Sequence, residues 1–152
     1  MSIRLETSKR TGIDNHQGQI APNLFVLDWT RKMQREHPKA VSRTKDSGLY
    51  NCHGLTFASR RTRIEKNSGI TSVLADDRYE EVTIAETIGG DVVVYYSEAG
   101  DPNHSGIVVE ICVGLNLPMI CSKWGSAGEF VHALSDCPSA YGPKHRFFRC
   151  RL

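Results

Sequence analysis

The stretch "GLYNCHGLTFASRRTRIEK", residues 48–66, places a cysteine after a short Gly/Tyr/Asn run and at the start of an amphipathic pattern. The pattern predicts a helix over about 52–66, closed by the "NSG" of residues 67–69. Its apolar side is expected to face the core through Leu55, Phe57, Ala58 and Ile64. The cysteine, Cys52, has two readings: a small buried residue, or a nucleophile whose thiolate is stabilised by the helix N-terminus.

The length and charge of the chain restrict the classes of protein to which it can belong. The 152 residues suit one domain with a proper core, and the formal net charge of +2 does not indicate a nucleic-acid or membrane partner. No apolar run has the length needed to cross a bilayer. The first residues lack the apolar region of a secretory signal, which predicts a cytoplasmic protein. We expect residues 1–18 to be a flexible segment before a single domain over 19–152.

The five cysteines do not form a recognisable disulfide or metal pattern. Their odd number and wide spacing, without a signal peptide, favour a reducing compartment. No CxxC pair and no His/Cys pair at helical spacing occurs, so we expect neither a metal site nor a cofactor. The five cysteines are Cys52, Cys112, Cys121, Cys137 and Cys150, and most of them are predicted to be core residues.

Helices are predicted in the first half of the chain. A helix should begin at about Pro22 and end near His37-Pro38, with Phe25, Trp29 and Met33 recurring at i, i+4 and i+8. The stretch 70–87 predicts a short helical turn followed by an irregular segment.

The second half is rich in β-forming residues. Strands are expected over 90–96, 104–113, 118–124 and 145–150, separated by turn formers. Together the two halves predict an α+β domain. N-terminal helices would pack on one side of an antiparallel sheet of about four to six strands.

His104 is the best candidate for a base that could serve Cys52. A nucleophilic cysteine needs a lowered pKa, a nearby base and a group that orients this base. His104 stands where a turn enters an apolar strand, before the small residues Ser105 and Gly106. Gly54, close after Cys52, would let a substrate backbone approach.

The series "NCHGLTFA … GDVVVYY … HSGIVVEI … SKWG" resembles the papain-like cysteine hydrolases of the NlpC/P60 and CHAP type. It is most similar to an uncharacterised bacterial branch that carries "NCHG" and "SKWG" boxes. The resemblance covers about residues 50–149. It implies a papain-like (NlpC/P60-type) fold, with Cys52 as nucleophile and His104 as general base. Gly90-Asp91 matches the "GD" that introduces the strand before the histidine strand.

The resemblance leaves the third catalytic group open. Members of this superfamily usually carry a polar residue, which orients the base, on the strand that follows it. Here Ser122 has that position, and Lys123, Glu129 and His132 remain alternatives. The residues expected to bind substrate are Asn51, Gly54, Asp77, Tyr79, Trp124 and His132.

These features favour a cysteine peptidase or amidase that cleaves an amide or isopeptide bond without a cofactor. The resemblance implies a peptide, a peptidoglycan stem peptide or a protein as substrate. It suggests a bacterial effector or a defence-associated protease, delivered to another cell by a secretion system or held by an immunity or regulatory protein. Two alternatives stay open: a catalytically inactive binding or inhibitor module, and an acyltransferase that uses the same thiolate.

Overall fold

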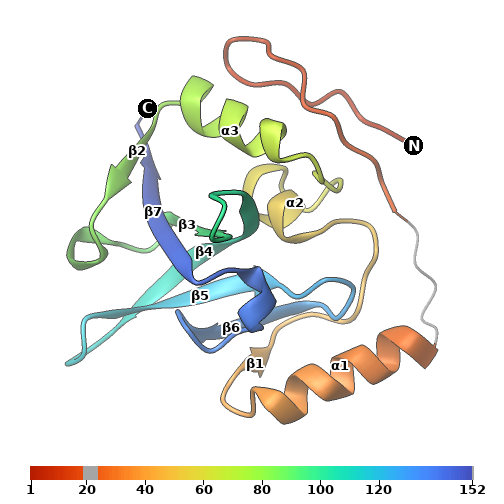
Figure 1. The fold of residues 1–152 in the computed structure, drawn as a ribbon, viewed down its shortest axis with the longest axis vertical. Helices are drawn as coiled ribbons and strands as arrows, with labels where there is room; N and C mark the ends of the chain where they lie inside the picture. Colours follow the sequence, from red (N-terminus) through yellow and green to blue (C-terminus); the bar gives the residue numbers. More distant parts are fainter. Residues whose placement is uncertain (19–23, 152) are drawn as a thin grey trace.

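The computed structural model describes residues 1–18 and 24–151 and has the α+β architecture that the sequence predicts (Figure 1). In the described part of the chain, seven antiparallel strands form one sheet in the order β1-β6-β5-β4-β3-β7-β2. The prediction of four to six strands is therefore too low. The helices are α1 (Leu24–Glu36), α2 (Cys52–Phe57) and α3 (Asn67–Asp76), with two single 3-10 turns, η1 (Ile84–Glu86) and η2 (Ser139–Tyr141). The strands are β1 (Val41–Ser42), β2 (Tyr79–Val82), β3 (Val92–Tyr96), β4 (Pro102–Cys112), β5 (Leu117–Lys123), β6 (Glu129–Ala133) and β7 (Lys144–Cys150).

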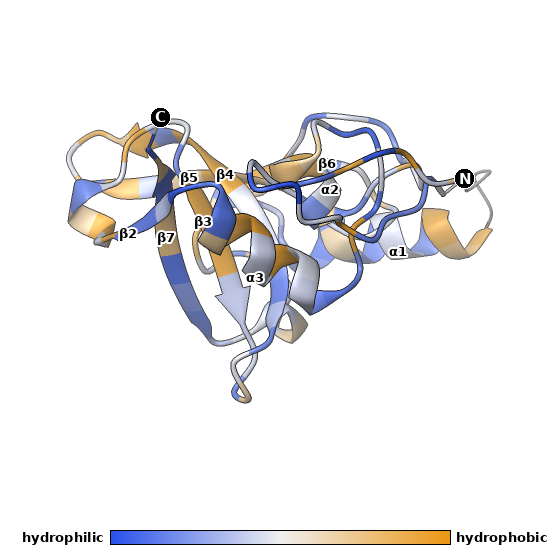
Figure 2. Ribbon diagram, turned by 90° about the horizontal axis from the view of Figure 1, so that it is seen from above, coloured by the Kyte–Doolittle hydropathy of each residue, from blue (hydrophilic) through white to orange (hydrophobic). Residues whose placement is uncertain are grey.

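The four predicted strands are all present, and they form the centre of the sheet together with β6. β3, β4, β5 and β6 follow one another as a meander, while β7 pairs with β3 and β2. Figure 2 shows hydrophobic segments gathered in the central strands β3 and β4. β3 is almost wholly buried, as its run of valines predicts. β1, β2 and β6 were not predicted, because two of them are short outer strands and β6 mixes charged and apolar residues.

Helices lie on both faces of the sheet. On one face Leu55 of α2 packs with Cys121, and Leu74 of α3 packs with Val94. The side chains that alternate with these strand residues form the opposite face, where Met33 of α1 packs on Trp124. The prediction that all helices cover one side is wrong, because α1 contacts the end of the second face.

The bounds of α1 agree with the prediction at its C-terminal end. The helix ends at Glu36, directly before His37-Pro38, while Pro22, its predicted start, lies outside the described residues. Of the three apolar residues at helical spacing, Met33 is buried and Trp29 half-buried, but Phe25 is 78% exposed.

α2 is much shorter than predicted. It ends at Phe57 because the chain turns at Ser59 and Arg60, which both adopt positive φ angles (49° and 65°). The following segment folds back so closely that a Cβ on Gly54 would lie 1.9 Å from the carbonyl oxygen of Thr62. Residues 67–69 then begin α3 and do not end α2. Of the stretch 70–87, expected to be a helical turn and irregular chain, the first part belongs to α3, and the remainder holds β2 and η1.

Residues 1–18 pack against the domain, which differs from the expectation of a flexible segment. Ile13 is 5% exposed and packs with Ile64 and Ile70. Asn15 bonds to the backbone of Ile3 and Ile13. The segment is thus part of the same core. Among the described residues, no helix is long and apolar enough to pass through a lipid bilayer.

Candidate active site

Asn51 fixes the start of α2 and so the place of Cys52. Its Oδ1 accepts hydrogen bonds from the backbone N–H groups of Gly54 (2.9 Å) and Ile64 (3.1 Å), and its Nδ2 donates to the carbonyl of Ile64 (2.7 Å). An asparagine N-cap satisfies amides that the first helical turn leaves free. Two residues expected to bind substrate therefore have structural roles. Asn51 caps the helix, and the space beside Gly54 is filled by the backbone of Thr62.

His53 binds α2 to β4 on both sides of His104. Its Nε2–H donates to the carbonyl of Pro102 (3.0 Å), so its Nδ1 accepts the hydroxyl of Ser105 (2.8 Å). His53 is buried, and burial lowers its pKa to about 4, which keeps the ring neutral in this role. The second residue of α2 thereby places Cys52 next to Ser105 at the start of β4. The ring of the preceding His104 points to the face of the sheet that carries Tyr95, and no hydrogen bond joins it to Cys52 within the described residues.

The thiol of Cys52 faces a group of backbone amides. Burial raises its pKa to about 11, and the N–H groups of Ser105, His53 and Cys52 itself oppose this rise without cancelling it. The helix N-terminus was expected to lower this pKa. In this structure desolvation outweighs the six-residue helix, because a buried thiolate loses its hydration. The resting residue is thus a neutral thiol whose charged form has three donors in place.

His104 is completely buried in β4 and makes no hydrogen bond through its ring. In the described part of the structure, both ring nitrogens lack a partner. Burial lowers the pKa of His104 well below the usual histidine value. The imidazole is therefore neutral at physiological pH, which is the form that can accept a proton. The ring of Tyr141 lies parallel to it, with centroids 3.7 Å apart and an interplanar angle of 7°.

Ser122, the predicted orienting residue, is hydrogen-bonded to other groups. His132 donates its Nδ1–H to the carbonyl of Ala133 (2.8 Å), so its Nε2 accepts the hydroxyl of Ser122 (2.7 Å). The Ser122 oxygen in turn accepts from the indole N–H of Trp124 (3.0 Å). No hydrogen bond joins Ser122 to His104 within the described residues.

Trp124 and His132 do not line a cleft in this structure. Both are completely buried, although both were expected to bind substrate. Trp124 stacks on Phe130 with centroids 4.3 Å apart, and burial lowers the pKa of His132 to about 4. They form part of the core behind His104.

Glu129, a second alternative for the third group, lies on the opposite face. It accepts hydrogen bonds from Tyr50 (2.7 Å) and from Nε (2.6 Å) and Nη2 (3.0 Å) of Arg60. Burial by itself raises its pKa, but these hydrogen bonds prevail and lower it. The carboxylate fixes Tyr50, two residues before Cys52, and makes no contact with His104.

Lys123 is completely buried near the loop that leads to Cys52. Its ammonium donates to the carbonyls of Ser47 and Gly125 (both 2.6 Å) and lies 5.1 Å from the centre of the Tyr50 ring. Burial lowers its pKa to about 8, and its charge favours the thiolate of Cys52. Lys123 therefore acts on Cys52 and not as an orienter of His104.

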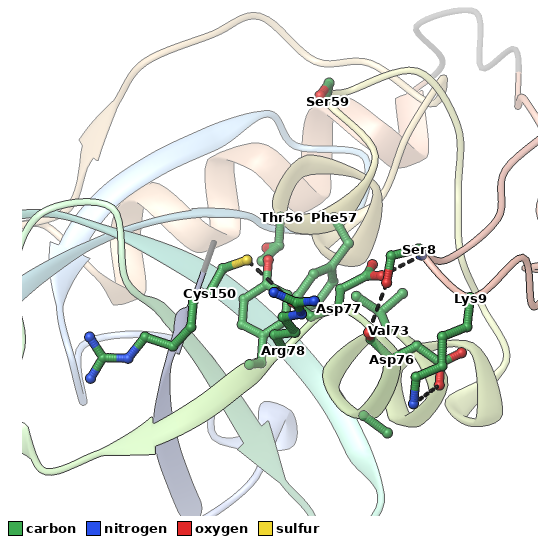
Figure 3. Close-up of a pocket in the computed structure, with 13 residues that line it drawn as sticks. Ser8, Lys9, Thr56, Phe57, Ser59, Val73, Asp76, Asp77, Arg78 and Cys150 are labelled. Carbon is green, nitrogen blue, oxygen red and sulfur yellow. Dashed lines mark hydrogen bonds and ion pairs between the residues drawn. The ribbon is translucent and has the colours of Figure 1, made fainter.

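Asp77 and Tyr79 line a cavity of about 960 Å³ whose wall includes Thr56 and Phe57 of α2. Figure 3 shows Thr56 and Phe57 reaching it from α2 and Asp77 from the end of α3. Thr56 is four residues after Cys52 on the same side of the helix, so the cavity begins about 6 Å along the helix axis. The volume suits a small-molecule or peptide ligand.

Two residues of this site, His53 and Tyr141, were not predicted from the sequence. His53 directly follows Cys52, and adjacent residues of a helix diverge, so the pattern does not link its side chain to the site. Tyr141 stands in "PSAYGP", a turn with no periodic pattern, so nothing in the sequence links it to His104. Both become visible only when β4 and η2 are placed in space.

Comparison of the chain with protein-family models, with curated proteins and with solved structures finds no match in any of the three. Among the described residues, no group of three His, Cys, Asp or Glu side chains is arranged to hold a metal ion.

Proposed function

We propose that the protein is a cysteine hydrolase of the peptidase or amidase class, with Cys52 as nucleophile and His104 as general base. One observation carries the proposal: His53 holds β4 at Pro102 and Ser105, on both sides of a buried, neutral and unpaired imidazole. The backbone N–H of Ser105, the amide that follows His104 in the chain, favours the thiolate of Cys52 and opposes the rise of its pKa.

The reaction starts from the neutral pair. As Sγ of Cys52 forms a bond to the substrate carbonyl carbon, the thiol proton passes to a ring nitrogen of His104. The negative charge that develops on the carbonyl oxygen is stabilised by the backbone N–H of Cys52. The C–N bond then breaks, and the leaving amine takes the proton from His104. A thioester to Cys52 remains.

Hydrolysis of the thioester regenerates the enzyme. Water gives a proton to His104 as its oxygen bonds to the acyl carbon, and the C–S bond breaks. The departing sulfur regains the proton from His104. If an amine takes the place of water, the same thioester yields a new amide, so an acyltransferase uses the same residues.

The substrate is proposed to enter beside the cavity that Asp77 and Tyr79 line. This cavity meets α2 one turn from Cys52, and its wall combines charged groups with the aromatic ring of Phe57. Such a lining suits a peptide, among them a peptidoglycan stem peptide, better than a purely apolar ligand. A bacterial effector or defence protease with an immunity or regulatory partner is the biological setting we propose from the resemblance.

A binding module is the second candidate, and two observations favour it. The pKa of Cys52 is raised, and no hydrogen bond orients His104 within the described residues. A protein that only binds a partner needs neither a thiolate nor an oriented base. The two candidates differ in one chemical property, which is the ability of Cys52 to accept an acyl group at neutral pH.

The experiment that separates them uses 4-nitrophenyl acetate as a generic acyl donor. Release of nitrophenolate is followed near pH 7, and the acetylated residue is mapped by peptide mass spectrometry. The hydrolase proposal predicts an acetyl group on Cys52 before any other cysteine. Cys52→Ser and His104→Gln serve as matched controls and should both lose this fast phase while remaining folded. Acetylation of Cys52 no faster than that of the exposed Cys150 would refute the hydrolase and favour the binding module.

A further inference from the structure

The imidazole of His104 is held by aromatic rings and not by a hydrogen bond. Tyr141 stacks on one side of it at 3.7 Å and 7°, and Tyr95, its neighbour across β3 and β4, lies at 5.4 Å with a tilt of 59°. Both ring nitrogens of His104 are left without partners among the described residues. The orientation of the ring therefore depends on packing, because no polar group of the described chain holds either nitrogen.

The turn that carries Tyr141 is fixed to the sheet. Tyr141 is the last residue of η2, and it packs against the core cluster that includes Tyr95, Leu134 and Phe147. Gly142, which follows, adopts a φ of 122°, and a Cβ there would lie 2.2 Å from the carbonyl oxygen of Tyr96. Only glycine permits this close approach. The turn that carries the tyrosine ring thus packs closely against the end of β3.

We propose that Tyr141 is the positioning residue for His104, its stacked ring taking the place of the hydrogen-bonded third group that other cysteine hydrolases use. The inference rests on the proposed function. A parallel ring at 3.7 Å restricts rotation of the imidazole about its Cβ–Cγ bond. At the same time it leaves both nitrogens without a hydrogen-bond partner among the described residues, so that the unprotonated one can take the proton of Cys52 and pass it to the leaving amine.

The hydroxyl of Tyr141 separates the role of the ring from that of the polar group. It is buried and has no hydrogen-bond partner within the described residues, and burial raises its pKa. An unpaired buried hydroxyl is unfavourable for folding. Tyr141→Phe removes this group and keeps the ring, whereas Tyr141→Leu removes the ring. The pair of variants is therefore matched to the question.

The test measures the acylation rate of Cys52 by 4-nitrophenyl acetate from pH 6 to 10. Wild type and Tyr141→Phe should share a level rate at neutral pH, since a positioned neutral imidazole takes the proton. Tyr141→Leu should be slower at pH 7 by about 10- to 100-fold, the effect of a misplaced catalytic group. Its rate should then rise with pH and approach that of wild type near pH 10, where the thiolate reacts without a base.

These outcomes separate the positioning role of Tyr141 from the proposed hydrolase function. If the acylation rate of the wild type has no pH-independent region near neutral pH, the proposed function itself is refuted. A wild type that has this region, together with a Tyr141→Leu variant of equal rate and profile, overturns the positioning role alone. Tyr141→Phe as slow as Tyr141→Leu also overturns it, because the hydroxyl would then be the active group. Should Tyr141→Leu not fold, Tyr141→Met supplies a flexible non-aromatic side chain for the same comparison.

Discussion

Mild acid should destabilise the protein, because three buried histidines are neutral in the folded state. Burial lowers the pKa of His53 and His132 to about 4 and that of His104 well below its usual value. An unfolded histidine has a pKa of about 6.5. Between these values protons bind the unfolded chain and not the folded one. The contribution of these neutral histidines to the free energy of unfolding is therefore fully present above pH 6.5, and it is lost as the pH falls from 6.5 toward 4.

The size of this effect follows from the pKa values. At pH 5 a shift from about 6.5 to about 4 costs about 2 kcal/mol for each histidine, so His53 and His132 together cost about 4 kcal/mol. His104 adds to the loss with the same sign. A domain of this size has a total unfolding free energy of about 5–15 kcal/mol. The acid loss is thus a large share of the whole stability.

Urea unfolding at pH 7.5, 6.5, 5.5 and 5.0 measures the effect. The unfolding free energy should fall by up to about 1.4 kcal/mol per pH unit for each buried histidine below pH 6.5. His132→Gln should reduce the slope by roughly one proton, whatever its effect on stability at pH 7.5. His16→Gln, at an exposed histidine, is the matched control. A free energy that stays constant down to pH 5, and falls only where carboxylates titrate, would refute the reasoning.

Three further substitutions test the framework around Cys52, each by urea denaturation at pH 7.5. Glu129→Ala should lower the free energy of unfolding by about 2–4 kcal/mol, because the buried hydroxyl of Tyr50 loses its acceptor while the half-exposed Arg60 regains water. A loss below about 0.5 kcal/mol would contradict this. Asn51→Ala should lower the free energy of unfolding by about 1–2 kcal/mol, because α2 loses its N-cap, and it should slow the acylation of Cys52. An unchanged acylation rate would show that the cap does not position the thiol. Gly106→Ala should cost about 1–3 kcal/mol, because its Cβ would lie 2.5 Å from a side chain of β5, and a neutral result would show that the strand pair can separate locally.

The sequence predicted those parts of the fold that depend on local pattern. The valine run of β3 and the β-rich run of β4 each predict a strand, and the Gly/Tyr/Asn run before Cys52 marks a helix start. The length of α2 could not be predicted, since it depends on contact between Gly54 and the backbone of Thr62, which is made by chain folding back from eight residues away.

In the candidate site, too, some residues could be predicted from local pattern and others depend on how distant segments pack. Cys52 and His104 lie at or near the starts of elements that the pattern identifies, so the element that carries each of them could be predicted. The partners of His104 could not. Ser122 has the expected place on β5, but His132 of β6 takes its hydroxyl, and the pairing of those strands is not visible in the chain. Tyr141 comes from a turn whose position depends on the packing of η2.

The most direct test of the central claim is the pH dependence of Cys52 acylation in wild type and His104→Gln. With a pKa of about 11, only about one thiol in ten thousand is ionised at pH 7. If His104 is the base, the wild-type rate stays level from pH 6 to about 8, while the His104→Gln rate rises tenfold per pH unit with the thiolate fraction. Equal rates that rise together with pH in both proteins would show that Cys52 reacts without His104, and the account of the site would be wrong.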